Sequence, residues 1–361
     1  MGYFKKIVLN NFRNFQNYEN NFSNSCNVLY GKNGSGKTNI LESLSLFSKG
    51  RGIRNDNLNN LIKLKESKFF NSGDYFYLNQ NYNIQIQSEE LNNRLIKKVS
   101  INNDFNRETI NYFYSIISFL VFLPEMDRLF LLSPSYRRNF IDRFIFSKNK
   151  NYNTLINKYK KHVSERNKLL VSNIYDETWI KKIEEEISFL GLEIYKFRAL
   201  QIKILEEHIK KLNTLQKTPF LVDIKHIDKF YKDSVDVEIY KEQLRQMREI
   251  DKFVGGAKYG PHKSDFMCYL NDDIPASQLS TGQQKSLVLI LILAQCNYLV
   301  NELNIKPIIL MDEVCSHLDE TNRSILLKII EEFDLQIFMT GTEKNFFSFL
   351  STNTNYYNIT V

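Results

Sequence analysis

The stretch that most constrains this chain is residues 31–38, which read GKNGSGKT. Glycine, four residues and then Gly-Lys-Thr form the phosphate-loop pattern. We expect a short buried strand over 27–30 and a helix from Lys37, because apolar residues follow at helical spacing. Glycines let such a loop turn where a Cβ would clash, and the first N–H groups of the helix point at the bound anion.

This pattern predicts a nucleotide site. Lys37 can reach the β- and γ-phosphates of ATP, and Thr38 can offer its hydroxyl to Mg²⁺. The residues expected to hold the phosphates are Gly31, Lys32, Asn33, Gly34, Ser35, Gly36, Lys37 and Thr38.

The composition indicates a globular protein. The chain has 361 residues, of which 43% are apolar, so we expect two or three structural units. The four cysteines, Cys26, Cys268, Cys296 and Cys315, are not paired at metal-ligand spacing and are expected to be reduced and mostly buried. The first nine residues lack the apolar core of a signal peptide, and the longest apolar run, 287–294, is far shorter than the roughly 20 residues that span a bilayer. These features predict a soluble, cytoplasmic protein.

Positive charge is concentrated in one segment. The net charge is +7, and residues 137–168 alone contain ten basic and two acidic residues. Such an excess can form an electrostatic footprint for nucleic acid, or it can be the solvated face of a lysine-rich helix. If the first interpretation holds, the candidate DNA-binding residues are Arg137, Arg138, Lys158, Lys160 and Lys161.

The expected type of secondary structure changes twice along the chain. Residues 1–128 mix strands with the phosphate loop, 129–252 are mainly helical, and 253–361 return to alternating strands and helices. Apolar residues repeat at spacings of three and four over 179–212, and a partner stripe lies over 152–171, as in a short coiled coil. The helical segment is therefore expected to be either an antiparallel arm or a compact bundle, inserted into an α/β domain.

Residues 279–285 read LSTGQQK and stand before an apolar helix expected over 286–300. Ser280 is a good helix N-cap, and Gly282 leaves the backbone bare at the helix start. The stretch resembles the signature motif of the ABC-type ATPases, usually LSGGQ. The resemblance implies that Ser280 donates its hydroxyl and Gly282 its N–H to the γ-phosphate of a nucleotide held by another subunit, with Gln283 in the same contact set.

A second acidic motif follows. Residues 307–311 read as a buried strand that ends at Asp312 and Glu313, the Walker B pattern. Asp312 is expected to hold Mg²⁺ partly through water, and Glu313 to orient and polarise the attacking water. Two adjacent carboxylates after a buried strand are uncommon unless a cation balances them. The next residues, 314–319, resemble the D-loop of the same superfamily, with matches at Ser316, Leu318 and Asp319.

The order of these motifs resembles the SMC class of DNA-handling ATPases, because a long helical insertion separates the phosphate loop from the carboxylates. Within that class, the sequence resembles the RecF family of bacterial recombination mediators over essentially its whole length. The residues that carry this resemblance are 11–15 (NFRNF), 31–42 (GKNGSGKTNILE), 122–125 (FLPE), Pro134, Arg137, Arg138, Asp142, 260–262 (GPH), 279–285 (LSTGQQK) and 340–342 (TGT).

The resemblance implies an ABC/SMC-type ATPase head, in which helices flank mixed sheets, with an inserted mainly helical arm. It also implies ATP and Mg²⁺ as ligands and an ATP-dependent homodimer that binds single- and double-stranded DNA and their junctions. RecR and RecO are the expected partners, and they assist the loading of RecA. No switch histidine follows the last strand and no glutamine lies near 122–127, so a weak ATPase that serves as a switch is expected.

Two other classes of protein also contain a phosphate loop. In a nucleotide-binding subunit of a transporter, the inserted helices and the basic segment would be out of place. A phosphate-loop kinase or GTPase would not need the 279–285 motif, and the chain has no Asn-Lys-x-Asp guanine-binding motif. For the adenine base, Arg13 is either a neighbour of the ring or a surface residue.

Overall fold

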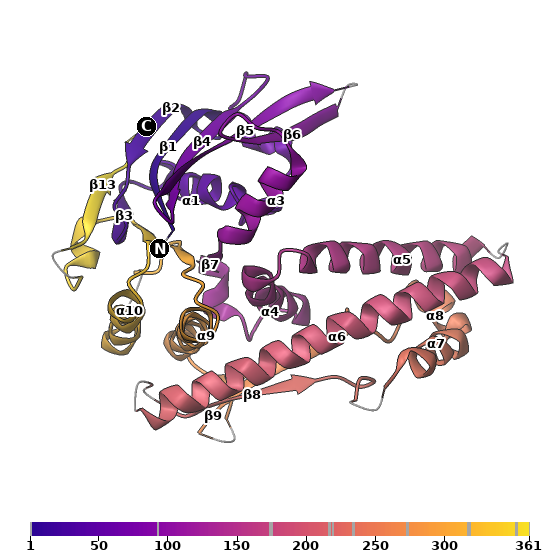
Figure 1. Ribbon diagram of the computed structural model, residues 1–361. Coiled ribbons are helices and arrows are strands. Elements are labelled where there is room, and N and C mark those ends of the chain that lie inside the picture. The colour runs from indigo at the N-terminus through magenta and orange to yellow at the C-terminus, as the bar shows by residue number, and fades with distance from the viewer. Residues whose placement is uncertain are drawn as a thin grey trace. The chain divides into compact units, whose positions relative to one another are not determined.

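The computed structural model describes residues 2–91, 94–172, 176–215, 218, 220–232, 235–271, 274–315, 319–350 and 353–360. The chain forms two compact units (Figure 1). The first unit combines Met1–Asp127 with Lys285–Val361, and the second is Arg128–Gln284.

The first unit contains a five-stranded antiparallel sheet in the order β2-β1-β4-β5-β6. Its strands are β1 (Tyr3–Phe12), β2 (Phe15–Asn21), β4 (Phe70–Tyr77), β5 (Gln80–Leu91) and β6 (Arg94–Ile101). The phosphate-loop helix α1 (Lys37–Leu46) lies under this sheet in Figure 1. At the end of α1, the ring of Phe47 packs against the ring of Phe4, with 5.2 Å between the ring centroids. The Phe47 ring also fills the space over Gly73, where an added Cβ would lie 2.9 Å from it.

A second sheet in this unit is parallel, in the order β13-β3-β12-β11-β7. Its strands are β3 (Cys26–Tyr30), β7 (Phe119–Phe122), β11 (Ile308–Met311), β12 (Ile337–Gly341) and β13 (Asn355–Asn358). The central strands β11 and β12 are buried along their whole length, as expected for a parallel sheet covered on both faces. Because all five strands run the same way, their carboxyl ends meet at one edge, and the phosphate loop follows β3 at that edge.

Helices complete the first unit. α9 (Thr281–Asn301) is fully buried over 287–294, and α10 (Glu320–Glu332) lies beside it in Figure 1. The hydroxyl of Ser286 on α9 donates to Asn322 of α10 at 2.9 Å. The shorter elements are α2 (Leu58–Leu61), α3 (Arg107–Ile116), η1 (Pro124–Arg128) and η3 (Lys344–Phe347).

A buried amide joins the two sheets. The Oε1 atom of Gln336, just before β12, accepts from the N–H of Phe4 in β1 at 2.8 Å. Its Nε2 donates back to the Phe4 carbonyl at 2.8 Å and to the Ser23 carbonyl at 2.7 Å. Gln336 is fully buried, so these three bonds form without competition from water.

The second unit is built on two long helices. α5 (Tyr152–Ser172) and the 38-residue α6 (Glu177–Thr214) lie antiparallel and side by side in Figure 1. At 1.5 Å per residue, α6 is about 57 Å long. The two helices pack against each other, and most of the predicted seam is buried. The buried residues are Ile180, Ile183, Ile187, Leu190 and Ile194 of α6 and Tyr152, Ile156, Tyr159 and Leu170 of α5. Around them lie α4 (Pro134–Lys148), α7 (Val237–Gln246), α8 (Arg248–Val254), η2 (Ala276–Gln278) and the sheet β8 (Val222–Ile227), β9 (Asp265–Leu270) and β10 (Ile274–Pro275).

A buried ion cluster fixes α5 to its neighbours. Arg166 is 1% exposed and donates to Glu184 of α6 at 2.9 Å, to Asp251 of α8 at 2.7 Å and to the Leu244 carbonyl at 2.6 Å. Arg248 adds a second cation beside Glu184, at 2.6 Å. The cluster therefore balances its charges internally.

The predicted fold class, an α/β head with mixed sheets and a helical insert, is confirmed. The division of the chain differs from the expected one, because the second unit continues past residue 253 to Gln284. The reason is that β9 pairs antiparallel with β8, and that Asp265 of β9 is bound by Arg137 of α4. The last part of the helical segment forms two helices, α7 and α8, which meet at Met247.

Two expectations from composition can be compared with the structure. All four cysteines are free and buried, and burial raises the pKa of the Cys26 and Cys315 thiols to about 12. Over the described residues, every helix is too short or too polar to cross a bilayer.

Candidate nucleotide site

The phosphate loop is packed so tightly that glycine is required at two positions. Gly36 has φ +97°, and a Cβ there would lie 2.5 Å from the ring of Phe15 and 2.7 Å from the amide of Asn14. Gly31 has φ +149°, and a Cβ there would lie 2.5 Å from the carbonyl of Ile359. The loop is therefore held between the β1–β2 turn and the end of β13, and it can adopt this path only without side chains at these positions.

Polar groups of the loop face inward. The Nζ of Lys37 donates to the carbonyls of Gly31 and Lys32, each at 2.8 Å. Burial lowers the pKa of Lys37 from its ordinary value, and the nearby carboxylates of Glu313 and Asp312 oppose that shift. The hydroxyl of Ser35 is buried without a hydrogen-bond partner among the described residues. A buried donor of this kind inside a loop of N–H groups fits a phosphate oxygen.

The acidic motif meets the phosphate loop at the same sheet edge. Asp312 follows β11, is almost fully buried, and accepts at Oδ1 from the hydroxyl of Thr38 at 2.9 Å. The same Oδ1 accepts from Thr340, at the end of β12, at 2.7 Å. The backbone N–H of Glu313 donates to the Thr340 hydroxyl at 2.8 Å, and the Glu313 side chain is exposed. The structure thus brings together Lys37, Thr38, Asp312 and Glu313, which the sequence predicted as one site.

The donor set also fits a magnesium ion. Mg²⁺ prefers hard oxygen ligands and usually takes only one or two protein groups besides water and phosphate. The Thr38 hydroxyl and the Asp312 carboxylate are such oxygens, and Asp312 Oδ2 makes no hydrogen bond within the described part of the chain.

A cavity of about 760 Å³ adjoins the loop. It is lined by residues 30–35, 342–345 and 358–360, and so it contacts the first half of the phosphate loop. Lys37, Thr38 and Asp312 do not line it. The cavity therefore extends the binding surface beside the phosphate cradle rather than containing the reactive groups.

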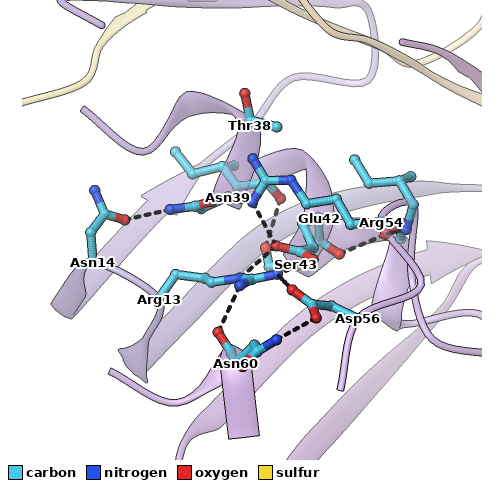
Figure 2. A network of polar contacts seen from close by, with 12 residues as sticks. Arg13, Asn14, Thr38, Asn39, Glu42, Ser43, Arg54, Asp56 and Asn60 are labelled. Carbon is cyan, nitrogen blue, oxygen red and sulfur yellow. Dashed lines mark hydrogen bonds and ion pairs between the residues drawn. The ribbon is translucent and has the colours of Figure 1, made fainter. Parts of the chain in front are cut away.

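A buried acid ties the phosphate-loop helix to two other segments (Figure 2). Glu42 of α1 is fully buried and accepts from Arg13 at 2.7 and 2.8 Å. Arg13 also pairs with Asp56 at 2.8 Å and donates to the Asn60 carbonyl at 2.7 Å. Arg13 is thus not an unattached surface residue, because its donors hold the phosphate-loop helix, and its position near the adenine ring stays a prediction. Glu42, an acid among the apolar residues of a helix, was the sequence signal for this network.

The same network touches the loop directly. Asn14 donates to the Gly34 carbonyl at 3.3 Å and accepts from Asn39 of α1 at 2.8 Å. Arg54 donates to Asn39 at 2.9 Å and to Glu42 at 3.3 Å, as Figure 2 shows. The β1–β2 turn and the segment after α1 are therefore fixed to both ends of the nucleotide-binding element.

The LSTGQQK motif, which belongs to the second unit as far as Gln284, forms the start of α9, five residues before the expected helix start. The Ser280 N–H donates to the Gln283 side chain at 3.1 Å, and the Gln283 N–H donates to the Ser280 hydroxyl at 3.3 Å. This reciprocal pair is a capping box. Ser280 and Gln283 are exposed and Gly282 is half-buried. Because the Ser280 oxygen is only an acceptor here, its hydroxyl proton remains available to a ligand.

Asp319 begins α10 as its N-cap, with its exposed carboxylate accepting from the Asn322 N–H at 2.8 Å. The rest of the predicted D-loop, at Ser316, His317 and Leu318, lies outside the described residues.

The candidate DNA-binding cations divide into two groups. Arg137 is 5% exposed, and its guanidinium is used by Asp265 and by the carbonyls of Phe130 and Leu132. Its prediction as a DNA contact is therefore not supported, because a buried, fully bonded side chain cannot reach a phosphate. Arg138 is half-buried, and its Nη1 donates to the Ser264 carbonyl. Lys158, Lys160 and Lys161 are exposed on α5.

The chain is similar to known proteins over almost its whole length. Residues 3–360 match the family described as RecF/RecN/SMC N terminal domain. The DNA replication and repair protein RecF of Rickettsia felis is 32% identical over 94% of this chain and 93% of its own. Two solved structures of the recombination mediator RecF in the RecFOR pathway, one with ATPrS and one with ATP, are also similar. Their TM-scores are 0.83 and 0.80 at 26% and 27% identity, over 97% and 95% of this chain and 94% and 92% of theirs.

Proposed function

The chain belongs to the RecF family, and from this premise we propose that it is an ATP-switched DNA-binding protein of recombinational repair. The observation that carries the proposal is the meeting of Lys37, Thr38, Asp312 and Glu313 at the carboxyl edge of the parallel sheet. Open α/β sheets bind their ligands at this edge. A solved RecF structure that contains ATP supports ATP as the ligand.

Each group has a separate task in binding and hydrolysis. The loop N–H groups and Lys37 bind the phosphates, while Thr38 and Asp312 hold Mg²⁺, which neutralises phosphate charge when bound. Glu313 orients the attacking water and takes up its proton. Its exposed side chain leaves it accessible to a water molecule. Without a switch histidine, we propose slow hydrolysis that times release rather than drives metabolism.

We propose that a second copy of the chain completes the site. The exposed capping box of Ser280 and Gln283 offers a hydroxyl proton and the N–H groups of a helix start to the γ-phosphate held by a partner chain. Because its position resembles that of the D-loop aspartate, we expect Asp319 to border the same interface. Nucleotide binding and pairing are then one event, and hydrolysis removes the charge that bridges the two copies.

The mass of the protein in solution tests this proposal. With a non-hydrolysable ATP analogue and Mg²⁺, light scattering after size exclusion is expected to give twice the mass of the 42.8 kDa chain. Without nucleotide, the mass of one chain is expected. A single-chain mass under saturating, bound nucleotide would contradict the paired mechanism.

The signature motif gives a second test. Ser280→Arg is expected to leave the Kd for ATP of the single chain within about twofold while abolishing the two-chain species, because the bulky cation blocks only the surface offered to a partner. Ser164→Arg, at an exposed position of α5, is the control and should pair normally. Nucleotide binding abolished already in the single chain would place Ser280 in its own chain's site instead.

We propose that the arm contributes to DNA binding. The second unit contains 28 basic and 21 acidic residues, a difference of +7 that equals the charge of the whole chain. Of its cations, Lys158, Lys160, Lys161 and Lys168 are exposed on α5, and Arg138 is half-buried in α4. By family membership, the expected DNA is gapped or at a junction of single and double strands, and RecR and RecO are the expected partners in loading RecA.

Replacing Lys158, Lys160 and Lys161 with glutamine is expected to reduce the slope of log K against log salt by about 0.9 for each duplex phosphate that the variant no longer neutralises. The matched control replaces Lys181, Lys196 and Lys210 of α6, each of which pairs with a glutamate, whereas in the test triple only Lys161 has such a pair among the described residues, with Glu165 at 3.7 Å. A titration of fluorescent gapped duplex at several salt concentrations measures both. Equal slopes for the two triple variants would place the DNA surface elsewhere.

A further inference from the structure

Thr340 contacts both acids of the Walker B motif, and no motif assigned it a task. It lies near the end of β12, between the phosphate-loop strand β3 and the acidic strand β11. The parallel register places Met339 opposite Met311, so the next residues on the two strands, Thr340 and Asp312, are also neighbours. Thr340 is fully buried.

The hydrogen bonds of Thr340 have only one possible direction. A threonine hydroxyl has one proton to donate and two lone pairs that accept. The N–H of Glu313 can only donate, so the hydroxyl oxygen accepts it at 2.8 Å. The hydroxyl proton is then left for Asp312 Oδ1, at 2.7 Å. Valine would fill the same space and provide neither bond.

The hydroxyl of Thr340 also helps to fix an unusual backbone conformation at Glu313. Glu313 has φ +49°, in the left-handed region that residues with a Cβ seldom adopt. Such conformations persist only where the surroundings fix them, and they gather at functional sites. The bond from the Glu313 N–H to Thr340 is a contact that fixes this one. The direction of the Glu313 side chain follows from its backbone, so it depends on the same hydroxyl.

We infer that Thr340 is a positioning residue for ATP hydrolysis, which aims Glu313 at water and holds Asp312 where it binds Mg²⁺. This inference rests on the proposed ATPase function. Thr340 is not a catalytic residue, because it acts through the two carboxylates. Thr38 holds Asp312 from the phosphate-loop side, so Thr340 and Thr38 fix the same oxygen from two elements that are distant in sequence.

The test compares Thr340→Val with Thr340→Ser, which restores the hydroxyl. For Thr340→Val, ATP binding in a metal chelator should stay within about twofold of wild type, because the phosphate loop is untouched. The Mg²⁺ concentration that half-saturates metal-dependent ATP binding should rise about tenfold. Single-turnover hydrolysis should fall by about 10- to 100-fold, as expected when a hydrogen bond to a charged group is removed. Thr340→Ser should return both quantities to within about threefold of wild type.

The possible results distinguish the role of Thr340 from the proposed ATPase function. Wild-type magnesium dependence and hydrolysis in Thr340→Val would overturn the role of Thr340 while the proposed function stands. A wild-type protein that does not bind ATP with Mg²⁺ would overturn both. If Thr340→Val does not fold, judged by its thermal unfolding, Thr340→Ala is compared with Thr340→Ser, because both variants lack the methyl group and differ only in the hydroxyl. Equal defects in these two variants would show that packing, and not the hydroxyl, is what matters.

Discussion

With Glu313 replaced by glutamine, ATP is expected to remain bound in a lasting complex of two chains. Glutamine keeps the size and the backbone of Glu313 but cannot take a proton from water. General-base catalysis contributes about 10²- to 10⁴-fold, so single-turnover hydrolysis should slow by that factor. Formation of the complex should be unaffected, because the phosphate loop and Ser280 are unchanged. Pairing without hydrolysis is therefore the expected phenotype.

Light scattering with ATP and Mg²⁺ measures this directly, since wild type should return to single chains as ATP is consumed and Glu313→Gln should not. Glu331→Gln, an exposed acid on α10, is the control and should behave as wild type. Hydrolysis by Glu313→Gln at the wild-type rate would show that another group activates the water.

Replacing Arg166 with methionine is expected to lower the free energy of unfolding of the second unit by about 3–5 kcal/mol. The substitution fills a similar volume but leaves Asp251 buried without its cation, and Glu184 with only Arg248. An unpaired buried charge is far more costly than the removal of a surface pair. Urea unfolding followed by fluorescence reports on this unit, because Trp179, the chain's single tryptophan, lies in the first turn of α6.

Two further variants, one a control and one a rescue, show whether the loss of stability comes from the unpaired buried charge. Lys168→Met, an exposed position on the same helix, should change the unfolding free energy by less than about 0.5 kcal/mol. Adding Asp251→Asn to Arg166→Met should recover part of the stability, because it removes the uncompensated charge. If Arg166→Met were as stable as Lys168→Met, the cluster would contribute specificity of packing rather than stability.

The nucleotide site was predictable because its signals are local. Glycines at 31, 34 and 36, a strand before them and an apolar helix after them are all visible within twenty residues of sequence. The same holds for the buried strand that ends at Asp312 and Glu313. What joins the two motifs is the order of the parallel strands, and the family resemblance, not local spacing, indicated that order.

It was harder to predict which basic residues are exposed and which are buried and paired with acids. Arg137 and Arg166 contributed to the basic segment, yet both are buried and bonded to acids outside it. Asp265 is 128 residues from Arg137, and Asp251 is 85 from Arg166. A count of charge along the sequence treats every arginine as exposed, whereas these two are neutralised by partners that only the fold brings near. Thr340 was missed for a similar reason, since its contact with Asp312 depends on the register between β11 and β12.

The three hydrogen bonds of Gln336 have a mechanical consequence. They join the antiparallel sheet to the parallel sheet in the protein interior, where water cannot replace a broken hydrogen bond. Bending between these two sheets would leave a carboxamide and at least one backbone group stranded in the interior. The two sheets should consequently turn as one rigid block, and any change of shape that ATP brings to this half of the molecule has to come from its loops or from a neighbouring copy.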